Sequence, residues 1–64
     1  MAPDEIRAAR LAFGLTQIQM AILLGYGAPA RIAEIEAGRR NPSESVLRLM
    51  RAYLDGYRPA DWPE

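Results

Sequence analysis

Arginine supplies the clearest candidate chemistry in this 64-residue chain. All eight basic residues are arginine, and the stretch from Arg31 to Arg51 holds five of them against three glutamates. A guanidinium group presents its N–H donors in a fixed fork, which suits phosphate oxygens and the edge of a guanine base. The formal net charge is zero, but a neutral protein can still present a basic face to an anionic partner.

The densest cationic site is the pair Arg39 and Arg40, directly after Gly38. Two adjacent guanidinium groups beside a helix end form a local anion site, so we expect them to contact phosphate. The alternative is an ordinary solvated surface charge, which contributes little to stability. Upstream, residues 25–30 (GYGAPA) carry almost no side chains before Arg31 appears. Because this stretch has few large side chains, a flat molecular surface could come close to its backbone.

The composition excludes several other chemistries. The chain has no Cys and no His, so it lacks disulfides, the usual metal ligands and the usual general base. No clustered set of carboxylates replaces them, and we expect no enzyme activity, no metal and no cofactor. No apolar run approaches the ~20 residues of a membrane span, and the N-terminus lacks a signal-peptide pattern. We therefore expect a cytoplasmic protein that does not enter a membrane.

Helices must position these side chains, because the sequence has helical periodicity and no strand pattern. The expected helices cover about residues 3–13, 16–24, 29–37 and 42–55. Thr16 and Gln19 fit a capping box at the start of the second helix, and Gly25 fits its left-handed end. The residues expected to face inward are Ile6, Ala9, Arg10 and Phe13; Met20, Ala21 and Leu24; Ile32 and Ile35; and Val46, Leu47, Met50, Tyr53 and Leu54.

The second and third helices form the most informative pair. Ala21 is small enough for another helix to cross closely, and Gly25 permits the positive φ that a short interhelical turn needs. Ile32 and Ile35 would then hold the third helix against the second, as in a helix-turn-helix; an ordinary helical hairpin is the alternative. We predict a compact all-α bundle of four helices plus a packed tail, in one domain over residues 1–64.

Two runs carry a resemblance to a known family. "GLTQIQMAILLG" and "RIAEIEAGRRNPS" resemble the Cro/CI-type (XRE, lambda-repressor-like) helix-turn-helix family, and the resemblance covers roughly residues 4–55. In that family a Gly-Leu-Thr-Gln run opens the second helix, and an Ile-Glu-x-Gly-Lys/Arg-Arg-x-Pro run follows the recognition helix. These runs are Gly14–Gln17 and Ile35–Pro42 here, in the right order and spacing. The resemblance implies a DNA-binding helix-turn-helix at about residues 16–37.

The resemblance also implies roles for individual positions. Gln17 would contact the DNA backbone and support a base-reading side chain, and free N–H groups near helix starts would add phosphate contacts. Arg10 and Glu36 match a partly buried ion pair between the first and third helices; we expect this pair to be structural, because Arg10 otherwise faces inward unpaired. The residues expected at the DNA backbone are Thr16, Gln17, Gly27, Arg39, Arg40 and Asn41.

The turn before the recognition helix departs from the family pattern. It is one residue longer, within Tyr26–Pro29, so the family's base-reading positions carry over to this turn only to within one residue. Ala28 and Ala30 cannot make bidentate hydrogen bonds, although they can touch thymine methyl groups. We expect Arg31 to read guanine, while Glu34 accepts from a cytosine amine or orients Arg31. An exposed Arg31–Glu34 surface pair is the alternative.

A second departure lies on the second helix. Ile18, Ile22 and Leu23 stand where the family commonly has charged residues. They would be buried by a wider core or by the tail, or they would form a patch for a second subunit. We expect Ile18 and Ile22 to be buried in the core.

The tail, residues 57–64, contains Pro59 and Pro63, which prevent a long regular helix. It also carries Tyr57 and Trp62, and disordered segments are typically poor in aromatic residues. We expect Trp62 to fold back near Tyr53 and Leu54, either within one subunit or on a second one. A free tail is the alternative.

These features predict a sequence-specific regulator of transcription that binds double-stranded DNA. Repression is favoured, as in the small regulators of phage and mobile-element operons that the chain resembles. We expect a homodimer on an inverted repeat in the major groove, with no small-molecule effector. The alternative is a protein-interaction module that keeps the fold without specific DNA binding. The neutral net charge and the small number of polar side chains at the base-reading positions favour that alternative. A measurement of salt-dependent DNA binding separates the two functions.

Overall fold

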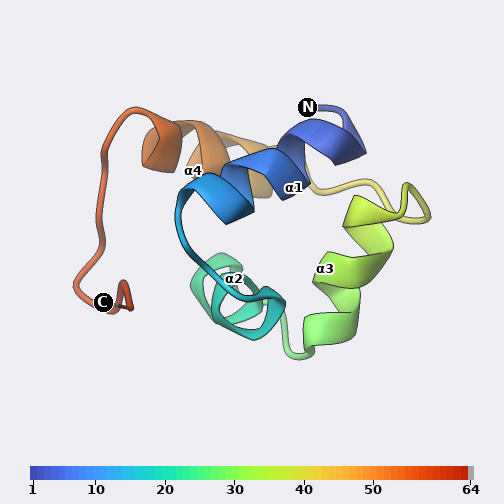
Figure 1. The fold of residues 1–64 in the computed structure, drawn as a ribbon, viewed down its shortest axis with the longest axis horizontal. Helices are drawn as coiled ribbons and strands as arrows, with labels where there is room; N and C mark the ends of the chain where they lie inside the picture. Colours follow the sequence, from blue (N-terminus) through green and yellow to red (C-terminus); the bar gives the residue numbers. More distant parts are fainter. Residues whose placement is uncertain (64) are drawn as a thin grey trace.

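The computed structural model describes residues 1–63, which form four α-helices and no strand over that range. The helices are α1 (Pro3–Ala12), α2 (Gln17–Leu24), α3 (Pro29–Glu36) and α4 (Glu44–Leu54). The predicted all-α class and the predicted order of four helices are therefore confirmed. In Figure 1, α1 and α4 occupy the upper part of the view and α2 and α3 the lower part. Glu64, the last residue of the predicted tail, lies outside the described residues.

The boundaries of α2 follow from its terminal residues. The Thr16 hydroxyl accepts a hydrogen bond from the Gln19 backbone N–H (3.1 Å), and the Gln19 side chain accepts one from the Thr16 N–H (2.9 Å). This is the predicted capping box. Gly25 ends the helix with φ 81°, a left-handed conformation that a residue with Cβ adopts only with strain. Both ends of α2 are thus determined by local sequence.

The core lies where the four helices meet. Met20 and Ala21 from α2 and Ile32 and Ile35 from α3 are all buried, so the predicted α2–α3 contact is confirmed. Tyr53 reaches across from α4, and its hydroxyl donates to the backbone carbonyl of Leu23 at 3.4 Å. The buried hydrophobic residues are Ile6, Ala9, Leu15, Met20, Ala21, Leu23, Ile32, Ile35, Met50 and Tyr53.

Several apolar residues lie elsewhere than predicted. Ile18 and Ile22 are 58% and 65% exposed, so the expectation that the core takes them is wrong. Leu23 is buried instead, and Leu24, predicted to face inward, is half-buried. Leu54, also predicted to face inward, is 51% exposed. The Leu23 carbonyl accepts a hydrogen bond from Tyr53 of α4, so this part of α2 faces the core, while Ile18 and Ile22 face solvent.

The tail packs on the end of α4 rather than extending into solvent. The Trp62 ring lies edge-on to Tyr53 (5.1 Å between centroids) and to Phe13 (5.4 Å). Tyr57 stacks on Tyr53 at 6.0 Å. Arg58 places its guanidinium 4.2 Å from the Trp62 ring centroid and donates to the Tyr53 and Tyr57 carbonyls, both at 2.8 Å. Trp62 therefore packs near Tyr53 within one subunit, as the first of the two predicted alternatives.

Candidate nucleic-acid interface

An ion pair fixes the far end of α3 to α1. The Arg10 guanidinium makes two bonds to the Glu36 carboxylate, at 2.7 Å and 3.1 Å, and a third to the Leu15 carbonyl at 2.9 Å. Both side chains are nearly buried, at 11% and 7% exposed. The predicted pair is therefore present, and its bidentate geometry sets the rotation of α3 about its own axis.

The start of α3 is bare and exposed. The turn between α2 and α3 spans Gly25–Ala28, and Ala28 precedes the helix without a side-chain cap. Pro29 is the first residue of α3, where its missing N–H costs nothing. Gly27, Ala28, Pro29, Ala30 and Arg31 are all exposed. A flat surface can approach this backbone closely, and Arg31 is the first long side chain that it would meet.

The start of α2 offers a different kind of contact. Thr16 is exposed and Gln17 is half-buried. The capping box occupies the Thr16 hydroxyl and the backbone N–H groups of Thr16 and Gln19. The N–H groups of the two residues between them point out of the first turn, where the helix dipole favours an anion.

The turn after α3 returns the chain alongside the helix. Gly38 has φ 78°, and the Arg39 N–H donates to the Glu34 carbonyl at 2.9 Å. This closure satisfies a carbonyl in the last turn of α3. Arg39, Arg40 and Asn41, the three residues that the sequence assigns to phosphate, are exposed just beyond it.

Glu34 lies between two arginines. One carboxylate oxygen is 3.3 Å from Nη1 of Arg31, and the other is 3.5 Å from Nε of Arg40. The side chains are 47% exposed for Arg31, 33% for Glu34 and 41% for Arg40. Ion pairs this exposed contribute about 0–1 kcal/mol to stability.

The link between Glu34 and Arg40 could not be found from the sequence. A spacing of six residues places two side chains on different faces of a continuous helix, so pattern reasoning finds only the Arg31–Glu34 pair. The chain reverses at Gly38, which brings Arg40 back to Glu34. Gly38 indicates that the chain turns back, because a helix that ends in a left-handed residue turns back on its last carbonyls. It does not indicate which side chains then meet.

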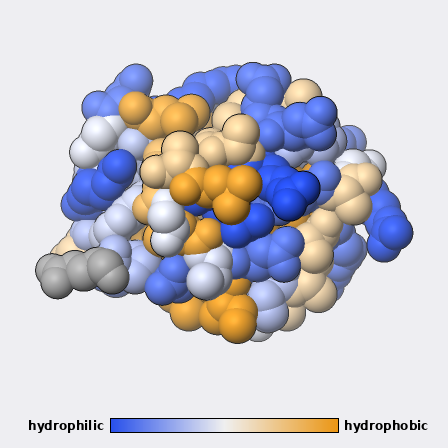
Figure 2. All heavy atoms as spheres, viewed as in Figure 1, coloured by the Kyte–Doolittle hydropathy of each residue, from blue (hydrophilic) through white to orange (hydrophobic). Residues whose placement is uncertain are grey.

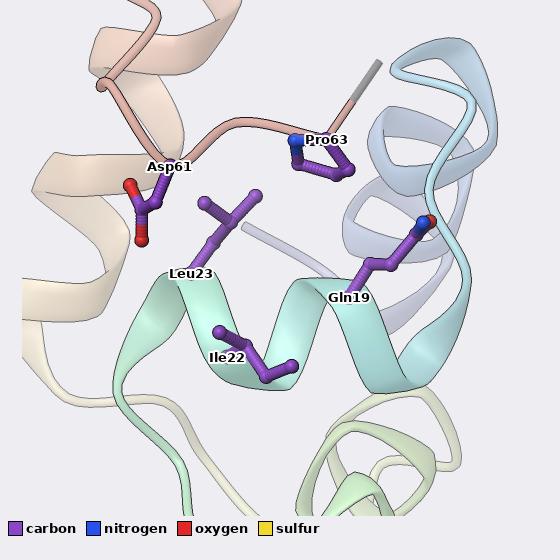
Figure 3. A pocket seen from close by; sticks show the side chains of 5 residues that line it. All are labelled: Gln19, Ile22, Leu23, Asp61 and Pro63. Atoms are coloured by element: carbon purple, nitrogen blue, oxygen red, sulfur yellow. The ribbon is translucent and has the colours of Figure 1, made fainter.

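Apolar surface lies away from this region, on the outer side of α2. Figure 2 shows hydrophobic residues along the lower edge of the view, where α2 lies in Figure 1. A shallow, open hollow separates α2 from the tail. Gln19, Ile22 and Leu23 line it from the helix, and Asp61 and Pro63 line it from the tail (Figure 3).

The helices α2 and α3 are joined at the left-handed Gly25. α3 has an exposed start without large side chains and is followed by a basic turn. This arrangement fits the helix-turn-helix class. The sequence model of the helix-turn-helix family matches residues 6–62, and the chain belongs to that family. The match is of the XRE, Cro/CI type, so the protein is a DNA-binding regulator of transcription. Comparison with curated proteins and with solved structures found no significant match.

No helix within residues 1–63 is long and apolar enough to cross a membrane. Over the same residues, no group of three or more metal-ligating side chains comes together.

Proposed function

We propose that the protein is a sequence-specific repressor of transcription that binds an inverted repeat of double-stranded DNA as a homodimer. The observation that carries the proposal is the exposed start of α3, where Arg31 follows a backbone almost free of side chains. α3 would enter the major groove with this end first. As one domain over residues 1–64, the protein would act by occupying its site, without catalysis, cofactor or effector.

Arg31 would read the sequence. Its guanidinium has the donors to bind O6 and N7 of one guanine, which is the commonest specific contact in the major groove. Ala28 and Ala30 would lie against thymine methyl groups, because they have apolar surface and no hydrogen-bonding group. One arginine and two methyl contacts read a short half-site, so specificity requires a second half-site.

Contacts to the DNA backbone would set the position of α3. Arg39 and Arg40 would bind phosphates beside the end of α3, with Asn41 next to them. Thr16 and Gln17 would approach a phosphate at the start of α2. Gly27 would allow the sugar-phosphate backbone to come close to the turn.

A second copy of the chain would supply the second half-site, with half-site centres about 34 Å apart or somewhat further. Two exposed apolar surfaces offer a contact for it. One is the Ile18 and Ile22 pair on α2, and the other is Leu54 with Tyr57 at the end of α4. Ile22→Glu and Leu54→Glu are matched single changes: the one that dissociates the dimer in sedimentation identifies the interface.

The regulated gene would belong to a small operon of the phage or mobile-element kind, and the protein would work in the cytoplasm, where its DNA is. A repressor needs only to cover a promoter, which suits a small domain. A reporter gene behind the bound site tests this, because a repressor lowers its expression and an activator raises it.

Selection of bound duplexes from a random pool tests the proposal. We expect enrichment of an inverted repeat with guanine in each half-site, and binding that weakens steeply as salt rises. Enrichment of a single half-site at saturating protein would contradict the dimer. No enrichment, together with the absence of any salt-dependent DNA binding, would leave a module that binds protein instead of DNA.

A further inference from the structure

We propose that Glu34 is a positioning residue that couples base reading by Arg31 to phosphate binding by Arg40. The inference rests on the proposed function and deepens it. Its basis is one carboxylate shared between two guanidinium groups, at 3.3 Å from Arg31 and 3.5 Å from Arg40.

The geometry connects two parts of the interface that have different tasks. Arg31 stands in the first turn of α3, and Arg40 follows the turn at Gly38. The backbone bond from the Arg39 N–H to the Glu34 carbonyl holds this turn against the helix. A change at Arg40 therefore reaches Arg31 through one side chain, without any movement of the helix.

The charges indicate how the coupling works. A carboxylate in a face that meets phosphates repels them, so Glu34 lowers the affinity of the protein for DNA of any sequence. The same carboxylate restricts the rotamers of Arg31, whose guanidinium then needs less ordering to meet one base edge. Glu34 thereby weakens non-specific DNA binding and strengthens the preference of Arg31 for one base. When a phosphate binds Arg40, the pairing of Arg40 with Glu34 changes, and so does the restraint that Glu34 places on Arg31.

The neighbouring arginine provides a matched control. Arg39 is also exposed and also precedes α4, but its backbone, not its guanidinium, contacts Glu34. Arg39→Ala and Arg40→Ala each remove one cation from the same turn. Only Arg40→Ala removes a partner of Glu34.

The first experiment needs no DNA. Side-chain Nε–Hε resonances of Arg31 are recorded by NMR in the wild type, Glu34→Gln, Arg39→Ala and Arg40→Ala. We expect the Arg31 resonance to shift in Glu34→Gln and Arg40→Ala and to stay in place in Arg39→Ala. If the Arg31 resonance responded equally to Arg39→Ala and Arg40→Ala, the proposed link from Arg40 through Glu34 to Arg31 would be overturned, whether or not the protein binds DNA.

The second experiment uses the selected duplex and its single base-pair variants. We expect Arg40→Ala to lower the preference for the Arg31 base pair at least about twofold, and Arg39→Ala to leave that preference unchanged while weakening all binding. Glu34→Gln should strengthen binding to random duplex, lower the same preference, and abolish the effect of Arg40→Ala on it. Unchanged preference in Glu34→Gln would overturn the inference, whereas loss of all enrichment by the wild type would overturn the proposed function.

Discussion

The ion pair between Arg10 and Glu36 supports the sharpest prediction about the fold. Glu36→Ala leaves the Arg10 guanidinium nearly buried with one remaining acceptor, the Leu15 carbonyl. Removing one partner of a buried pair costs about 3–5 kcal/mol. A 64-residue domain has a total stability of about 3–10 kcal/mol, at roughly 0.05–0.15 kcal/mol per residue. We therefore expect Glu36→Ala to lower the free energy of unfolding by about 3–5 kcal/mol, which is at least about a third of the total.

The assay is urea denaturation followed by far-ultraviolet circular dichroism. Glu44→Ala is the matched control, because Glu44 is 66% exposed and lies 3.9 Å from Arg48. Removal of such a surface carboxylate should change the free energy of unfolding by less than about 1 kcal/mol.

A double substitution separates the charge from the space it fills. Arg10→Met with Glu36→Leu replaces the pair by apolar side chains of similar volume, and such replacements are often neutral or stabilising by about 1–4 kcal/mol. We expect the double variant to be more stable than Glu36→Ala alone. A Glu36→Ala variant as stable as Glu44→Ala would refute the reasoning, because the pair would then behave as a surface contact.

Three further predictions concern the basic turn, Tyr53 and the tail. Arg39→Ala should weaken binding to all duplexes and reduce the slope of log K against log salt by about 1, measured by fluorescence anisotropy; an unchanged slope would remove Arg39 from the phosphate contacts. Burial raises the pKa of the Tyr53 hydroxyl above its ordinary value, and the Asp61 carboxylate adds to the rise. The folded state therefore favours the neutral phenol, so this contribution to stability is complete below about pH 10 and is lost as pH rises through the folded pKa. Denaturant titrations should show that Tyr53→Phe flattens the alkaline loss, and an equal loss in both proteins would contradict the assignment. Trp62 is the only tryptophan, and its fluorescence maximum in the native protein should be blue-shifted relative to that of tryptophan in water. The maximum should move to longer wavelength in denaturant and stay the same when the protein is diluted. A water-like maximum in the native protein would contradict the packed tail.

Much of the fold could be predicted because local rules determine it. The capping box at Thr16 and the left-handed residue at Gly25 depend on side chains within a few positions of each other. The inward position of Arg10 indicated that it needs a partner, and the resemblance to the family identified that partner as Glu36. The order and class of the helices follow from such signals.

The errors have a common physical cause. Which residues of α2 are buried depends on contacts with distant elements, such as the hydrogen bond from the Tyr53 hydroxyl of α4 to the Leu23 carbonyl. Periodicity alone therefore could not tell that Leu23 would be buried while Ile18 and Ile22 stayed exposed. Leu54 is likewise exposed, although Tyr53 beside it is buried.

The candidate interface was predicted residue by residue but not as an arrangement. The sequence indicates Arg39 and Arg40 by their place after Gly38, and Arg31 as the long donor near the start of the third helix. That Glu34 joins Arg31 to Arg40 depends on the reversal at Gly38 and on two rotamers, which no sequence spacing encodes.

The central claim is that Arg31 reads a base from the bare start of α3. Its most direct test measures the affinity of Arg31→Ala for the selected duplex and for every single base-pair variant of it. Arg7→Ala, an exposed arginine on α1, is the control. We expect Arg31→Ala to lose about 1–3 kcal/mol per half-site and to lose preference at one base pair, while Arg7→Ala keeps both. Unchanged base preference in Arg31→Ala would contradict the account.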